Sequence, residues 1–144
     1  MELHDSVAAM AIADAEAAVI AAREYNGQLD YSEESLMELE SILARFCGQQ
    51  RGPEDISERC KIWGSYLGEV VRRRFGGEWS IDSYPGKQFA TLTLTVNGSR
   101  IFPSMKVHRR LTQGEAENVW SFYKMIKSRL ESLPSSGVPA PSVQ

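Results

Sequence analysis

Two groups of basic residues have the types and spacing that could do chemistry in this chain. They are Arg72, Arg73 and Arg74, and, further along, Lys106, His108, Arg109 and Arg110. Guanidinium groups bind phosphate or carboxylate through paired hydrogen bonds. If both groups lie at the same end of a sheet, they form an anion site. The residues of that site would be Arg72, Arg73, Lys106, Arg109 and Arg110.

A structural role accounts for the same cations. On a helical wheel Arg72 lies opposite the apolar stripe, and Arg73 follows Glu69 by four residues, the favourable order for an ion pair. Cations also stabilise the last turn of a helix. We prefer this interpretation and keep anion or nucleic-acid binding as the alternative, because nucleic-acid binding is typical of a more basic domain.

The sequence offers few candidate nucleophiles and few candidate metal ligands. A Cys–His pair can be written with Cys60 and His108, but Cys60 lies in an apolar stripe that predicts a buried thiol. Cys47 and Cys60 are the two cysteines, and they lack the close spacing of a structural zinc site. We therefore expect no catalytic residue, no metal and no cofactor.

Length and composition bound the architecture. The chain has 144 residues and a formal net charge of −3, which fits one domain and by itself implies neither a nucleic-acid nor a membrane partner. The start is acidic, and Asp14 and Glu16 interrupt the alanine-rich stretch that follows. We therefore expect no secretory signal and no membrane span, and a cytoplasmic location.

Helical periodicity dominates the first half of the chain. The patterns predict helices from about residue 5 to 25, from a cap at Asp30 or Ser32 to Gly48, and from an Asp55–Glu58 capping box to Gly76. Gly64 and Gly68 lie inside the third helix, where each costs about 1 kcal/mol relative to alanine. Close contact with the alanine-rich first helix is the simplest compensation.

The second half begins with a change to strand periodicity. Residues 78–84, 88–96 and 99–105 predict an antiparallel meander with an Asn97-Gly98 hairpin turn. The expected cross-strand pairs are Val96–Ser99, Leu94–Ile101, Leu92–Pro103 and Ala90–Met105 on the apolar face, and Thr95–Arg100 and Thr93–Phe102 on the other. Because Phe89 and Phe102 fall on the threonine-bearing face beside Arg100, we expect Phe89, Arg100 and Phe102 to form a docking surface for a partner. The alternative is that they pack across the strands.

A last helix follows from the Thr112–Glu115 capping box to Leu130. The prediction is therefore an α+β fold of the order ααα-βββ-α, with three N-terminal helices, a three-stranded antiparallel meander and a C-terminal helix. Residues 1–131 form a single domain, and the Pro/Ser-rich residues 132–144 form a disordered tail.

Residues 66–79, with the sequence YLGEVVRRRFGGEW, resemble the signature of a family of small bacterial α+β domains of unknown function. Three further segments fit that family: Phe102-Pro103, residues 106–110 and residues 118–123. The resemblance covers about residues 55–130. It implies a fold and carries no activity to this chain.

The interpretation of the whole sequence is a non-catalytic, protein-binding module. Its expected contact surfaces are the second face of the sheet and the edge of the third strand. A small cytoplasmic bacterial inhibitor or immunity-type protein fits this description. Anion or nucleic-acid binding through the Arg/Lys groups is the alternative, and an enzyme comes third.

Overall fold

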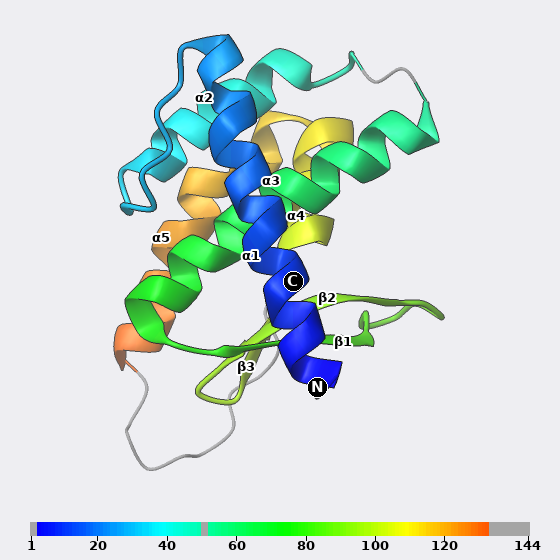
Figure 1. Cartoon of the computed structure of the whole chain (residues 1–144), viewed down its shortest axis with the longest axis vertical. Helices are drawn as coiled ribbons and strands as arrows, with labels where there is room; N and C mark the ends of the chain where they lie inside the picture. Colours follow the sequence, from blue (N-terminus) through cyan, green and yellow to red (C-terminus); the bar gives the residue numbers. More distant parts are fainter. Residues whose placement is uncertain (1–2, 50–51, 133–144) are drawn as a thin grey trace.

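The computed structural model describes residues 3–49 and 52–132, and over them the chain folds into five α-helices and a three-stranded antiparallel sheet (Figure 1). The α+β class is confirmed. The elements are α1 (Leu3–Ala22), η1 (Arg23–Tyr25), α2 (Ser35–Phe46), α3 (Pro53–Phe75), β1 (Glu78–Ser83), β2 (Ala90–Val96), β3 (Ser99–Ile101), α4 (Pro103–Gln113), η2 (Glu115–Glu117) and α5 (Val119–Ser132). Residues 133–144 of the expected tail lie outside the described residues.

Helix α3 is the centre of the fold, with α1 packed on one side and α4 on another (Figure 1). The face of α1 toward the core consists of small side chains, Ala11, Ala15, Ala18 and Ala22, all of them fully buried. Spacings of three and four residues place them in one row. Because alanine is small, α1 approaches α3 closely along this row.

The glycines of α3 pack against α4, not against α1 as expected. A Cβ added at Gly64 would lie 2.6 Å from the Cα of Ser104. One added at Gly68 would lie 2.1 Å from the Cη2 atom of Trp79 and 3.0 Å from Pro103. The absence of side chains at these two positions therefore lets the start of α4 and the ring of Trp79 lie directly on α3.

The sheet follows the predicted meander as far as Ile101. The ladder pairs Val96 with Ser99, Leu94 with Ile101 and Thr95 with Arg100, as the two-residue turn requires. The expected pairs Leu92–Pro103, Ala90–Met105 and Thr93–Phe102 are wrong, because the strand ends at Ile101 and α4 begins at Pro103. Proline is favoured at the first position of a helix, where its missing N–H costs no hydrogen bond.

The expected order ααα-βββ-α is wrong in one respect, because helix α4 lies between the sheet and the last helix. The observed order of α-helices and strands is ααα-βββ-αα. The predicted Thr112–Glu115 capping box does not form, since both residues precede the start of α5. Instead, the side-chain oxygen of Asn118 accepts hydrogen bonds from the backbone N–H groups of Trp120 and Ser121. The Asp55–Glu58 box is also wrong: α3 starts at Pro53, and Asp55 pairs with Arg59.

Candidate functional site

The arginines at the end of α3 surround a buried carboxylate. Glu69 is fully buried and accepts hydrogen bonds from Arg72 at 2.5 and 2.9 Å, from Arg73 at 3.3 Å and from the indole N–H of Trp79 at 2.9 Å. Burial disfavours its charged form, but these donors outweigh burial and hold the pKa of Glu69 below its usual value. The guanidinium of Arg73 also lies 3.5 Å from the centre of the Tyr31 ring.

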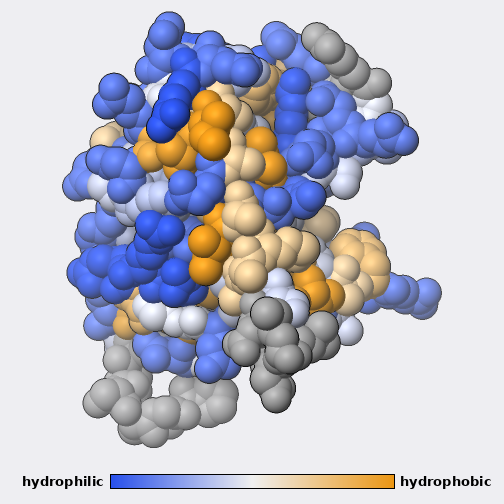
Figure 2. All heavy atoms as spheres, viewed as in Figure 1, coloured by the Kyte–Doolittle hydropathy of each residue, from blue (hydrophilic) through white to orange (hydrophobic). Residues whose placement is uncertain are grey.

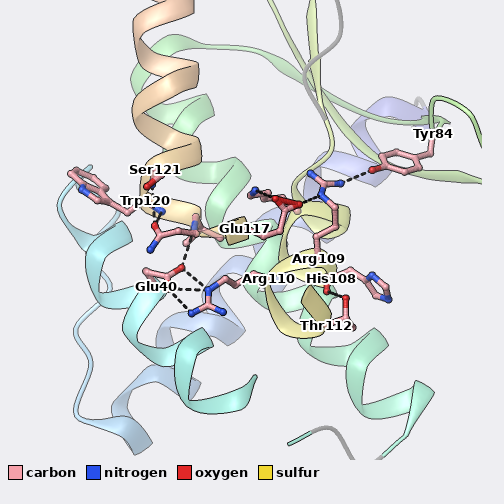
Figure 3. Close-up of polar contacts among 12 residues, drawn as sticks. Glu40, Tyr84, His108, Arg109, Arg110, Thr112, Glu117, Trp120 and Ser121 are labelled. Carbon is pink, nitrogen blue, oxygen red and sulfur yellow. Dashed lines mark hydrogen bonds and ion pairs between the residues drawn. The ribbon is translucent and has the colours of Figure 1, made fainter. Parts of the chain in front are cut away.

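Three basic residues of α4, namely Lys106, Arg109 and Arg110, are also paired within the chain (Figure 3). Glu117 accepts hydrogen bonds from Arg109 at 2.6 Å and from Lys106 at 3.3 Å. The guanidinium of Arg110 is buried and reaches Glu40 on α2 at 2.8 Å. Glu40 also accepts the backbone N–H of Val119, so this one carboxylate joins α2, α4 and the start of α5.

The expected anion site is therefore divided among several acidic partners. Arg72 and Arg73 share Glu69, while Lys106 and Arg109 share Glu117. Burial lowers the pKa of Lys106, although Glu117 opposes that change. Arg73 pairs with Glu69 one helical turn earlier, as the structural interpretation of the sequence predicted, and Lys106 and Arg109 join α4 to η2.

The expected docking residues meet around Tyr84, which the sequence did not single out. The ring of Phe89 stacks on Tyr84 with centroids 5.7 Å apart, and Phe102 meets Tyr84 edge-on at 5.2 Å. Arg100 lies 5.8 Å above the Phe102 ring. Phe102 is fully buried, so its expected place on an exposed surface is wrong, whereas Phe89 is exposed.

The second face of the sheet is also less open than expected. Thr93 on that face is fully buried, and its hydroxyl donates to the backbone carbonyl of Thr91. The third strand is only three residues long, which leaves a short edge. Phe102 is buried because the chain turns into α4 directly after β3, so that strand alternation no longer sets its direction.

A groove of about 700 Å³ lies between α1, the first half of α3, β2 and α4. Its lining is mostly apolar. The residues are Met10, Asp14, Pro53, Ile56, Ser57, Cys60, Lys61, Thr91, Leu92, Ser104, Met105 and His108. On the face that Figure 2 shows, apolar side chains gather along α1 and beside the β1–β2 hairpin. We call this site the groove.

The thiol that lines the groove is not an activated nucleophile. Cys60 is 8% exposed, and burial raises the pKa of its thiol to about 12. A thiol in that state remains protonated at neutral pH and is a weak nucleophile. Figure 3 shows the His108 side chain directed away from the Arg109 and Arg110 pairs, and the backbone carbonyl of His108 accepts the hydroxyl of Thr112.

One carboxylate lines the groove. Asp14 on α1 has a side chain that is 15% exposed, and its Oδ1 atom lies 3.9 Å from the Nζ atom of Lys61 on α3. Burial raises the pKa of Asp14; Lys61 opposes the increase, and Glu58 adds to it. The arrangement provides an acceptor for a hydrogen bond or a cation on an otherwise apolar wall.

Sequence reasoning missed the groove because its lining comes from four elements. Met105 was placed on a strand, and no local pattern shows that α4 faces α1. One signal was present: Met10 and Asp14 lie four residues apart on the same side of an alanine-rich helix. A methionine and an aspartate there interrupt a run of small side chains.

Two other features, a membrane-spanning helix and a metal site, have no candidate among the described residues. Within residues 3–49 and 52–132, no helix is long and apolar enough to span a membrane. Over the same described residues, no group of three or more His, Cys, Asp or Glu side chains is arranged to hold a metal ion. The resemblance of residues 66–79 to a bacterial domain family stays a prediction. Comparison of the chain with protein-family models, curated proteins and solved structures gave no match.

Proposed function

We propose that this protein is a non-catalytic binding module whose groove receives an apolar segment of a partner protein. The observation that carries the proposal is the groove itself. It has a volume of about 700 Å³ and a mostly apolar lining, which four elements contribute. Binding sites are typically concave and apolar, with a few polar groups that fix orientation. The groove has this composition, with Asp14, Lys61 and His108 as the ionisable groups apart from Cys60.

The apolar surface extends beyond the groove, which favours a protein segment over a small compound. Met10 lines the groove and is 44% exposed. Ile81 is 46% exposed and lies opposite Leu92, a lining residue, in the β1–β2 ladder. Directly opposed residues share a face of the sheet. A segment of a partner would cover both side chains together, whereas a small compound inside the groove would leave Ile81 in water.

The two methionines support the same proposal. Met10 and Met105 line the groove from α1 and α4. The unbranched methionine side chain changes rotamer at low cost and adapts to the shape of an incoming apolar group. Surfaces of this kind are typical of proteins that accept segments of partner chains.

The alternative, an anion site made of Arg72, Arg73, Lys106, Arg109 and Arg110, has less support. Each of these cations lies within 4 Å of a carboxylate of the same chain. An external phosphate would have to displace carboxylates that hold the elements together. The groove requires no such displacement.

A matched pair of variants at Ser57 tests the proposal. Ser57 lines the groove but is exposed, so Ser57→Trp adds a ring to the groove without entering the core, and Ser57→Ala changes the same position with little bulk. Random peptides displayed on phage are selected on the wild-type protein and then bound to both variants. We expect apolar peptides that bind the alanine variant and lose at least about tenfold in affinity on the tryptophan variant.

Two results would overturn the proposal. Selection could yield no enriched peptide, or the enriched peptides could bind Ser57→Trp and Ser57→Ala equally well. Circular dichroism of both variants shows whether the fold is retained.

A further inference from the structure

Asp14 is the feature of the groove that a purely apolar occupant would not use. Its carboxylate lies on the wall that α1 contributes, where it forms an ion pair with Lys61. At 3.9 Å that pair is longer than a hydrogen bond. Lys61 is 51% exposed and has a flexible stem, so its ammonium group can turn away from Asp14 into water.

Asp14 is the one carboxylate among the described residues that line the groove. The sequence of α1 contains no lysine or arginine. Glu58 on α3 lies close enough to Asp14 to act on its charge. Lys61 and His108 are the basic residues that line the groove, and they stand on α3 and α4 rather than on α1. On the α1 side of the groove, a bound cation would therefore meet the carboxylate of Asp14, with Glu58 nearby and no lysine or arginine from that helix.

We infer that the partner segment presents a lysine or arginine among its large apolar side chains, and that Asp14 binds this cation in the groove. This inference rests on the proposed function and specifies the chemistry of the partner. The apolar side chains occupy the surface around Met10, Leu92 and Met105, and the cation takes the position that Lys61 holds in the free protein. Complementary charge then fixes the register of the segment in the groove.

The protonation behaviour of Asp14 agrees with this assignment. Burial raises the pKa of Asp14, so the folded protein disfavours the ionised carboxylate relative to the unfolded chain. Lys61 does not fully compensate. A bound cation would supply the missing stabilisation, and binding would lower the pKa of this side chain.

The test compares the wild-type protein with the isosteric variant Asp14→Asn. It uses peptides selected by phage display whose binding depends on the groove. We expect lysine or arginine to be enriched among peptides selected on the wild-type protein, and not among peptides selected on Asp14→Asn. In a selected peptide, replacement of the lysine by norleucine should weaken binding to the wild-type protein by about tenfold and leave binding to Asp14→Asn unchanged, as a double-mutant cycle measured by calorimetry. Glu38→Gln removes an exposed carboxylate of α2 that does not line the groove, and it should behave as the wild type does.

The outcomes separate this inference from the proposed function. Peptides that depend on the groove but carry no enriched cation would overturn the role of Asp14 and leave the binding module standing. Replacement of the lysine by norleucine could instead weaken binding equally to the wild-type protein and to Asp14→Asn. That result would also overturn the role of Asp14. Peptides indifferent to Ser57→Trp would overturn both.

Discussion

Replacement of Glu69 by glutamine should destabilise the protein by about 2 kcal/mol. The carboxylate accepts hydrogen bonds from Arg72, Arg73 and Trp79. A glutamine oxygen can still accept the indole N–H, but the two arginines lose a charged partner. A hydrogen bond to a charged group contributes roughly 1 kcal/mol more than a neutral one, and the two arginines therefore account for about 2 kcal/mol. Both arginines are about one-third exposed, which holds each contribution to the lower end of the range.

The destabilisation caused by Glu69→Gln should depend on pH in a defined direction. The pKa of Glu69 in the folded protein lies below the usual value of 4.5. A carboxylate with a lowered folded pKa stabilises the protein in full above its unfolded pKa, and that stabilisation is lost as the pH falls through the folded pKa. The difference between the wild type and Glu69→Gln should therefore be largest at neutral pH and shrink below pH 4.5.

Urea unfolding followed by circular dichroism measures this difference at each pH. Glu131→Gln is the control, because Glu131 is half-exposed, lies 3.8 Å from the half-exposed Arg74, and should change the free energy of unfolding by less than about 0.5 kcal/mol. The reasoning fails if Glu69→Gln matches that control at neutral pH. It also fails if the loss from Glu69→Gln stays the same in acid.

Three further outcomes are expected. Gly68→Ala should destabilise the protein by about 2 kcal/mol or more despite the better helix propensity of alanine, because its Cβ would lie 2.1 Å from the Trp79 ring; thermal unfolding that matches wild type would contradict this packing. Asn118→Ala should cost about 1 kcal/mol through loss of the cap on α5, measured by urea unfolding, whereas Asn118→Ser should restore most of it. Cys60 should resist iodoacetamide in the native protein and react after unfolding, as mass spectrometry can show; rapid native labelling would argue for an activated thiol and against the non-catalytic assignment.

Local patterns were sufficient to predict much of the fold. The hairpin turn at Asn97-Gly98 set the register of β2 and β3, since a two-residue turn leaves one pairing for the flanking residues. Helix α4 was missed because Pro103 is compatible both with an edge strand and with the first turn of a helix. Val107 and Leu111, four residues apart and both buried, carried the helical signal.

The candidate site depended on contacts that no local pattern contains. Arg110 and Glu40 are 70 residues apart in the sequence and hydrogen-bonded in the structure, so the partner of this arginine could not be predicted from its neighbours. Arg73 differs, because its partner Glu69 lies one helical turn away. The groove resembles the Arg110–Glu40 pair in this respect, because α1, α3, β2 and α4 meet only in the folded chain.

Only Phe102 separates β3 from α4, and its side chain is buried. Such a short, anchored connection limits independent movement of β3 and α4, and β2 pairs directly with β3. Helix α3 is also packed directly on α4, which leaves α1 as the wall of the groove that we expect to move. A crosslink between α1 and α3 should therefore slow both the entry and the release of a bound peptide.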